Sequence, residues 1–267
     1  MSNGSGTTAV PLSSARSAAV QPPAISVIMP ARNADAHLSR AVLSVQGQTR
    51  QDWELIIADD GSTDTTFTLA RELARDDARI RPLARQEGDP RGAAAARNRA
   101  IAQARGRYLG FLDADDEWLP EKLARQLGWM EECRLALTFS GFWRMRKGHR
   151  HEVRVPAQVT REQLLCGNVI GTLTAICDRT LLGEIEMPHL SRRHDYALWL
   201  DLLTRTDAAH GLQEPLAVYH VTQGSLSSSR LRSIRATWRV YRDHAGLSRL
   251  RAAWCLSSHL IRRLFRG

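Results

Sequence analysis

The chain has 267 residues, of which 43% are hydrophobic, so it can bury a substantial core in one domain or in two closely packed halves. It contains no run of about 18 apolar residues, which argues against a membrane-spanning helix, and its start lacks the basic and apolar stretches of a signal peptide, so a cytoplasmic location is expected. The net charge of +9 lies entirely in residues 228–267, where ten arginines accompany one acid, Asp243, and this distribution argues against a surface built for nucleic acid.

Strand and helix patterns alternate through the first half of the chain. Residues 1–23, rich in Ser, Gly, Ala and Pro, are predicted to be a disordered leader. The runs AISVIMP and WELIIADD are predicted to be buried strands, and AHLSRAVLSVQGQ between them has helical spacing. The pattern recurs as a helix over about Asp64–Ala74, the strand IRPLA, the helix AAAARNRAIAQA and the strand RYLGFLD. This alternation predicts an α/β fold with a mostly parallel central sheet and helices on both faces.

Polar segments follow three of these strands. Open α/β sheets bind ligands at the carboxyl ends of their strands, so we expect Pro30–Asn33, Asp59–Asp64 and Asp113–Asp116 to meet at one crevice. By itself DDGSTD could also be an ordinary acidic turn, with Gly61 permitting the tight bend. Asp64 is placed to cap the helix that follows.

The stretch FLDADDEWLP crowds acidic side chains behind an apolar run. Neighbouring carboxylates repel one another unless a cation lies between them, and Asp113 and Asp115 can face one Mg²⁺ or Mn²⁺. A solvated acidic loop is the alternative that this motif leaves open. An EF-hand is disfavoured because Trp118 stands where that loop needs glycine.

Cysteine spacing indicates neither a zinc site nor a disulfide framework. Cys133, Cys166, Cys177 and Cys255 are widely separated and form no CxxC pair. Buried free thiols are therefore expected.

Three segments, in this order, resemble family 2 glycosyltransferases of the GT-A fold, of the type that builds bacterial surface polysaccharides. They are ISVIMPARNADAHLSRAVLSVQGQTRQDWELIIADDGSTDTT, GAAAARNRAIAQARGRYLGFLDADDEWLPEKLARQL and RRHDYALWLDLL. The resemblance covers about Ile25–Leu231 and implies a nucleotide-binding half over 24–118 and an acceptor half over 119–227, before basic amphipathic helices over 228–267. The implied activity is inverting transfer of a sugar from a nucleotide-sugar donor to a hydroxyl of a saccharide or lipid-linked saccharide.

The resemblance also assigns roles to individual residues. It implies a nucleotide-sugar site made of Pro30, Ala31, Arg32, Asn33, Asp59, Asp60, Ser62, Arg97, Asp113 and Asp115. Asp59 would accept a hydrogen bond from the nucleobase, and Arg97 would contact the diphosphate or nucleotide. Asp113 would be the ribose-side acid, and Asp115 the direct ligand of a divalent Mn²⁺ or Mg²⁺ that Asp113 adjoins. The family often has an aromatic residue where this chain has Arg32, and a solvated helix arginine is the alternative for Arg97.

The attacking hydroxyl must lose a proton, which calls for a carboxylate or imidazole within hydrogen-bond reach. Asp195 lies near the start of the helix predicted over HDYALWLDLL, where the helix dipole favours a carboxylate. The family commonly has Glu-Asp here with the second acid as the base, so the resemblance implies that Asp195 is the catalytic base. His194 replaces the Glu. The alternative is a helix acid without a catalytic role.

A histidine that completes the metal shell in many relatives is replaced here by Thr222. His220 could substitute, because a step of two residues keeps the same strand face. A histidine that is hydrogen-bonded or exposed is the alternative.

The C-terminal segment RLRAAWCLSSHLIRRLFRG is predicted to be a basic amphipathic helix. Its expected apolar stripe comprises Leu250, Trp254, Leu260, Ile261, Leu264 and Phe265, with Arg249, Arg251, Arg262, Arg263 and Arg266 beside or opposite it. The helix either packs on the catalytic body or meets an anionic membrane, where each arginine would contribute on the order of 1 kcal/mol. The second option suits a lipid-linked acceptor and predicts peripheral association with the inner face of the cell membrane.

Other function classes fit less well. A non-catalytic nucleotide-sugar-binding protein of the same fold would be expected to lack Asp115 or Asp195, and both are present. Nucleic-acid binding through the tail would be steeply salt-dependent, but the tail carries no recognisable nucleic-acid motif, so no such partner is expected. A sugar nucleotidyltransferase is disfavoured because no glycine-rich triphosphate loop follows the first strand.

Overall fold

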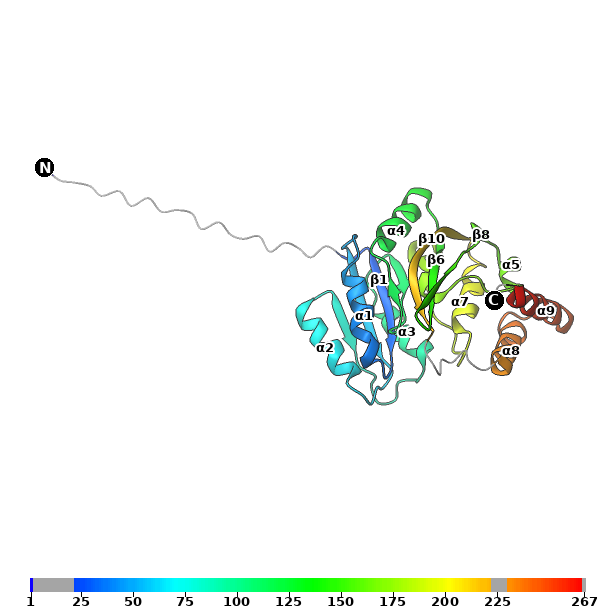
Figure 1. Ribbon diagram of the computed structural model, residues 1–267, viewed down its shortest axis with the longest axis horizontal. Helices are drawn as coiled ribbons and strands as arrows, with labels where there is room; N and C mark the ends of the chain where they lie inside the picture. Colours follow the sequence, from blue (N-terminus) through cyan, green and yellow to red (C-terminus); the bar gives the residue numbers. More distant parts are fainter. Residues whose placement is uncertain (2–21, 222–229, 266–267) are drawn as a thin grey trace.

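A computed structural model describes Met1, residues 22–221 and residues 230–265 of the chain (Figure 1). The leader expected over residues 1–23 therefore lies almost wholly outside the described residues. Within them the strands are β1 Ile25–Ala31, β2 Trp53–Asp59, β3 Ile80–Leu83, β4 Tyr108–Phe111, β5 Glu117–Trp118, β6 Leu137–Arg146, β7 His149–Val153, β8 Gln158–Val159, β9 Ile176–Asp178 and β10 Ala209–His220. The helices are α1 Asp35–Gln46, α2 Thr66–Asp76, α3 Ala93–Ala102, α4 Lys122–Cys133, α5 Arg161–Leu165, α6 Arg179–Leu182, α7 His194–Leu202, α8 Arg230–Arg239 and α9 Arg249–Phe265, with short turns η1 Thr172–Thr174 and η2 Val240–His244.

The described strands form one sheet in the order β3-β2-β1-β4-β9-β6-β10-β5, with β7 paired to β6 and β8 to β10. Strands β3, β2, β1 and β4 are all parallel, as the alternating pattern predicts. Strand β9 runs antiparallel to β4 and β6, and β10 is parallel to β6. The mostly parallel α/β sheet is confirmed, and its second half mixes parallel and antiparallel pairs.

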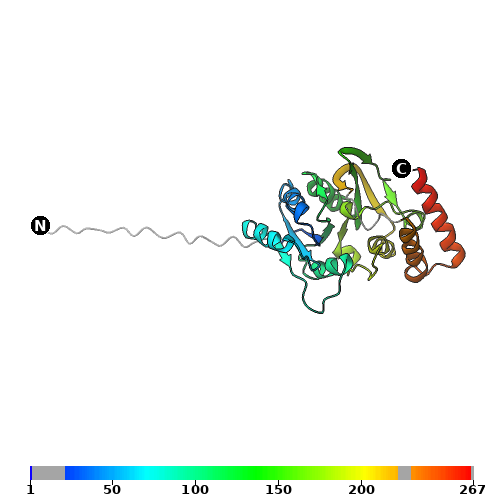
Figure 2. The same ribbon diagram turned by 60° about the horizontal axis from the view of Figure 1, so that its bottom comes forward.

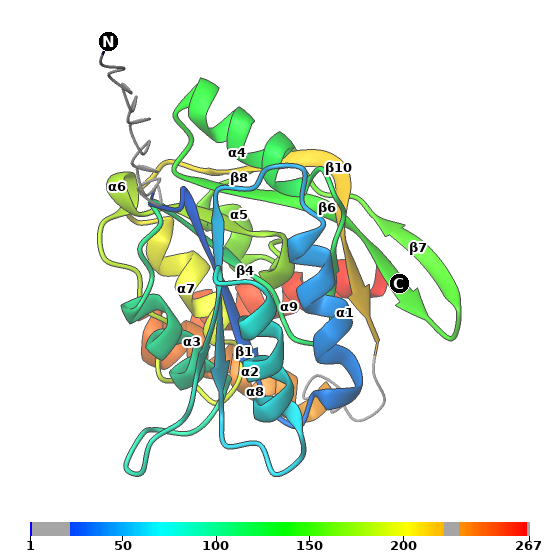
Figure 3. The same ribbon diagram turned by 90° about the vertical axis from the view of Figure 1, so that its left-hand side faces the viewer.

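Helices cover both faces of the sheet, and alternate residues of β1 show how. Val27 and Met29 face a core with α1 and α4, whereas Ile28 faces a second core with α3 and α7. Figure 3 shows α1 and α3 on opposite sides of β1. Because β1, β2 and β4 are parallel, the loops that follow them emerge at one edge of this sheet.

Helix bounds differ from expectation by a few residues. Helix α2 begins at Thr66 rather than near Asp64, and the Asp64 carboxylate accepts the Thr66 N–H at 3.0 Å, so it caps the helix from just outside. The C-terminal helices are present, with α8 and α9 packed side by side at the end of the molecule beyond α5 and α7 (Figures 1 and 2).

Candidate active site

The loops after β1 and β2 are fastened together by Asn33. Its backbone adopts the left-handed conformation (φ 48°), which asparagine tolerates better than most residues. The Asn33 N–H donates to Ser62 Oγ at 3.0 Å, and Asn33 Oδ1 accepts the Thr63 N–H at 2.9 Å. The segments Pro30–Asn33 and Asp59–Ser62 therefore meet at the sheet edge, as expected.

Two buried aspartates shape this edge. Asp59 Oδ2 accepts the N–H groups of Gly61 and Ser62 at 2.9 and 3.0 Å, while its buried Oδ1 has no hydrogen-bond partner among the described residues. Asp60 accepts the N–H of Gly92 at the start of α3, and its Oδ2 lies 3.8 Å from the exposed guanidinium of Arg32. A buried carboxylate oxygen without a protein donor is suited to accept a hydrogen bond from a ligand.

Asp113 and Asp115 are partly exposed in the loop after β4, and Asp116 beneath them is buried. Asp116 Oδ1 accepts the His220 N–H at 2.9 Å and so ties β10 to the acidic loop. Burial raises the pKa of Asp116 to about 9, and the charges of Asp113 and Asp115 add to this effect. Asp116 is thus a buried structural acid that follows the two residues that would face a metal.

Arg97 joins the acidic loop to helix α7. The side chain is buried, so the alternative of a solvated arginine is wrong. One end of its guanidinium donates to Asp113 Oδ1, and Nη1 lies 2.7 Å from His194 Nε2. Because arginine only donates, His194 Nε2 must accept, which requires a neutral imidazole. Burial, followed by the Arg97 charge, lowers the pKa of His194 and favours that neutral form.

Asp195 stands in the first turn of α7, next to the residue that Arg97 holds. Its side chain is partly exposed, and Oδ2 accepts a hydrogen bond from Thr172 Oγ1 at 3.1 Å. Thr172 opens the short turn η1.

Turn η1 is itself held by buried polar side chains that the motif analysis missed. Trp118 Nε1 donates to the Leu173 carbonyl at 2.8 Å. Lys122 Nζ and Gln126 Nε2 both donate to the Thr174 carbonyl, at 3.1 and 3.0 Å. Lys122 is fully buried, and burial lowers its pKa to about 7. The sequence does carry a signal for this buried network: Lys122 and Gln126 lie four residues apart on the apolar face of a helix that also carries Leu123 and Leu127.

His220 is a hydrogen-bonded histidine beside the acidic loop. Its Nε2 lies 2.6 Å from Glu117 Oε1, and the same carboxylate oxygen is 3.0 Å from Arg40 Nε. The Arg40 side chain also donates to the Asp115 carbonyl at 2.9 Å, which fixes the loop from the side of α1. Thr222 lies outside the described residues.

The donor atoms suit a divalent ion only in part. In the portion of the chain that the structure describes, no group of three or more His, Cys, Asp or Glu side chains is arranged to hold a metal. Asp113 and Asp115 offer the carboxylate oxygens that Mg²⁺ and Mn²⁺ prefer, and Mg²⁺ is commonly bound by one or two carboxylates together with substrate phosphates. The residues therefore fit an ion that is shared with a diphosphate.

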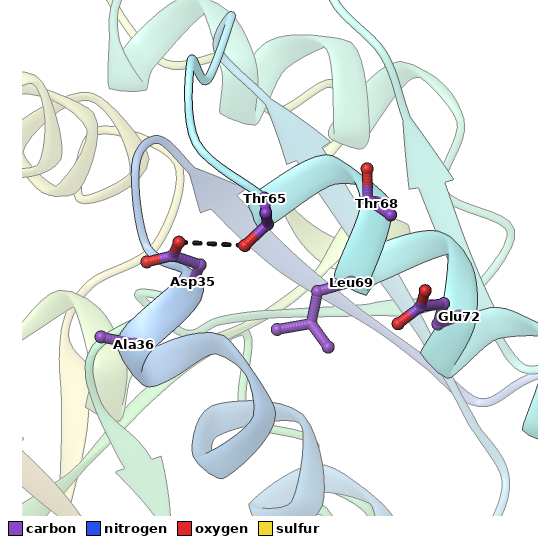
Figure 4. Close-up of a pocket in the computed structure, with 6 residues that line it drawn as sticks. All are labelled: Asp35, Ala36, Thr65, Thr68, Leu69 and Glu72. Atoms are coloured by element: carbon purple, nitrogen blue, oxygen red, sulfur yellow. Dashed lines mark hydrogen bonds between the residues drawn. The ribbon is translucent and has the colours of Figure 1, made fainter.

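A hollow of about 430 Å³ between α1 and α2 lies apart from these residues (Figure 4). Its lining comprises Asp35, Ala36, Thr65, Thr68, Leu69 and Glu72. Thr65 Oγ1 donates to Asp35 Oδ2 at 3.0 Å across its rim. Because the lining includes neither the residues of the acidic loop nor those of α7, we assign the hollow no role in the chemistry.

Comparisons with known proteins agree with this geometry. The relatives include a putative teichuronic acid biosynthesis glycosyltransferase, TuaG of Bacillus subtilis, which is 38% identical over 87% of this chain and 93% of its own. The β-1,3-glucosyltransferase WfgD of Escherichia coli, named as acting from UDP-Glc on α-D-GlcNAc-diphosphoundecaprenol, is 33% identical over 82% of this chain and 85% of its own.

Solved structures share the fold at low identity. TarS of S. aureus with UDP-GlcNAc has a TM-score of 0.68 and 19% identity, over 88% of this chain and 71% of that one. The mannosyltransferase PcManGT of Pyrobaculum calidifontis with GDP-Man and Mn²⁺ has a TM-score of 0.66 and 18% identity, over 89% and 69%. The model of the family described as Glycosyl transferase family 2 matches residues 26–177. Because this model covers more than half of the chain and TuaG is 38% identical over most of it, the chain belongs to glycosyl transferase family 2.

Proposed function

We propose that the chain is an inverting, metal-dependent glycosyltransferase that moves a sugar from a nucleotide sugar to a hydroxyl of a saccharide or lipid-linked saccharide. The observation that carries this proposal is the Arg97 bridge. It holds Asp113, on the acidic loop, and His194, the neighbour of Asp195, on one guanidinium. The donor-binding acids and the base are thereby brought together from distant parts of the chain.

The residues divide the work of a single displacement. The free oxygen of Asp59 accepts from the nucleobase, and the loop residues Pro30–Asn33, with Asp60 and Ser62, line the nucleoside side. Arg97 stabilises negative charge on the leaving diphosphate. Asp115 and Asp113 would hold a Mn²⁺ or Mg²⁺, which supplies a Lewis acid for the same charge.

Asp195 removes the proton of the acceptor hydroxyl as that oxygen attacks the anomeric carbon. Thr172 holds one carboxylate oxygen, and the other would take the proton. Attack from the side opposite the leaving group inverts the anomeric configuration. A binding protein without catalysis would not need a base held in this way.

The relatives support a place in surface-polysaccharide assembly. We propose that residues 24–118 bind the donor and residues 119–227 the acceptor, and that the acceptor is presented on a lipid at the inner face of the cell membrane. Within the described residues, none of the helices is long and apolar enough to cross a membrane.

Two conservative variants separate binding from chemistry. Donor affinity is measured by calorimetry with UDP-glucose, UDP-GlcNAc and GDP-mannose in Mn²⁺, and transfer with the sugar that binds. Asp115→Asn should lose Mn²⁺-supported donor binding. Asp195→Asn should retain it but transfer at least about a hundredfold more slowly, because an amide cannot accept the proton. Asp76→Asn, at an exposed acid ending α2, is the matched control. Near-normal transfer by Asp195→Asn would refute the base, and unchanged Mn²⁺-supported donor binding by Asp115→Asn would refute the metal site.

A further inference from the structure

Helix α9 is attached to the body by one face. Ala252 and Cys255 are buried, and Leu256 packs against the core. The ring of His259 lies 6.1 Å from that of Tyr196, the residue after Asp195. This inner face fixes α9 on the helix that carries the proposed base.

The opposite face of α9 carries large apolar side chains in solvent. Leu250 is 87% exposed, Trp254 73% and Ile261 54%. At about 100° per residue these three fall within about 40° of one another and on the far side from Ala252 and His259. We call Leu250, Trp254 and Ile261 the outer ridge.

Helical spacing predicts Leu250, Trp254, Leu260 and Ile261 on one stripe, and the structure divides that stripe. Leu260 is half-buried, whereas the outer ridge residues are exposed. Packing on the body and contact with a membrane were treated as alternatives, but this helix has a separate face for each.

Charge around the outer ridge favours an anionic surface. Arg249 and Arg251 are exposed and lie about 100° to either side of Leu250 on the helix. On the neighbouring helix α8, Arg232, Arg235 and Arg239 are also exposed. The region 228–267 contains ten arginines and one acid. An apolar ridge flanked by cations is the pattern of helices that lie in the headgroup layer of an anionic bilayer.

We propose that the outer ridge inserts into the headgroup layer of an anionic lipid bilayer while the inner face stays packed on α7. This inference rests on the proposed function, since it gives a lipid-linked acceptor a reason to meet this enzyme at the membrane. It assigns the contact to three side chains. It also leaves α9 between the membrane and the helix that holds Asp195.

Vesicle co-sedimentation tests the ridge with the full-length chain. The variant Leu250→Gln/Trp254→Gln/Ile261→Gln is compared with wild type on phosphatidylglycerol-containing vesicles, and circular dichroism checks that both are folded. Partitioning should fall by about tenfold for each ridge side chain, because burying a large apolar side chain is worth at least that factor. Leu43→Gln, at a residue 60% exposed on α1, is the matched control and should leave partitioning unchanged.

A second variant tests the charges. Arg249→Gln/Arg251→Gln should weaken binding to anionic vesicles by about fivefold for each arginine and leave binding to neutral phosphatidylcholine unchanged. Equal vesicle binding by wild type and the folded ridge variant would overturn the inference. So would a wild-type dimer that ignores vesicles and becomes monomeric in the ridge variant, because the ridge would then meet a second copy.

The proposed function is tested separately from this inference. Donor binding and transfer to an acceptor analogue without a lipid should be retained by the ridge variant. If only the membrane inference is wrong, the wild type still transfers sugar to the lipid-free acceptor, but the ridge variant binds vesicles as well as the wild type does. If only the proposed function is wrong, the wild type still binds vesicles through the ridge but transfers no sugar.

Discussion

The buried Lys122 makes a prediction about the pH dependence of stability. Its side chain is fully buried, and burial lowers its pKa from 10.5 to about 7. Between these two values the unfolded chain binds a proton that the folded chain does not hold. The free energy of unfolding should therefore rise with pH from about 7 to about 10.5, and this contribution is lost as the pH falls through the folded-state pKa.

The magnitude follows from the two pKa values. At about 1.4 kcal/mol per pH unit, the separation between 10.5 and about 7 corresponds to about 5 kcal/mol over the whole interval. Between about pH 7.5 and about pH 9.5, the contribution is about 2.5 kcal/mol. Lys122→Met keeps the length of the side chain without a titratable group, so it should lack this rise.

Urea denaturation of wild type and Lys122→Met at both pH values measures the effect. Other titrating groups affect both proteins equally. Their contribution cancels when the change in the free energy of unfolding with pH for the variant is subtracted from that for the wild type. If the free energy of unfolding depends on pH in the same way in the two proteins, the reasoning is refuted, because the Lys122 amine would then remain charged in the folded protein.

Two further predictions concern the site and the sheet. Thr172→Val keeps the shape of the residue but removes the hydrogen bond to Asp195, so kcat should fall by about tenfold or more with donor affinity unchanged; equal loss of donor affinity would show that η1 shapes the donor site instead. Gly106→Ala would place a Cβ 2.6 Å from the Ser26 backbone nitrogen and should lower the free energy of unfolding by about 1–3 kcal/mol in urea denaturation. Gly128→Ala on α4, where an added Cβ meets nothing within 4 Å, is the control and should be neutral or stabilising. Equal urea midpoints for the two variants would contradict the packing argument.

Local patterns in the sequence were enough to predict the nucleotide half. The spacing of apolar residues identifies buried strands and amphipathic helices within short stretches of sequence, and parallel strands must end at one edge of the sheet. The meeting of Pro30–Asn33 with Asp59–Ser62 follows from those two facts, and the hydrogen bonds of Asn33 confirm it. Roles for Asp115 and Asp195 came from resemblance and stay predictions.

Contacts between distant residues were beyond the sequence patterns. Arg97 and His194 are 97 positions apart, and Lys122 and Thr174 are 52 apart. No periodicity pairs such residues, because their meeting depends on how the second half of the sheet joins the first. The antiparallel pairing of β9 with both β4 and β6 joins the two halves and decides that geometry.

The C-terminal helix shows the same division between sequence and tertiary structure. The sequence determined that α9 is helical, amphipathic and basic, since spacing and charge are local properties. Which apolar residues are covered depends on the surface that the helix meets. Packing on the body, where His259 meets Tyr196, buries Ala252 and Cys255 and leaves Leu250 and Trp254 in solvent, because one side of a helix can rest on the body while the other must face away.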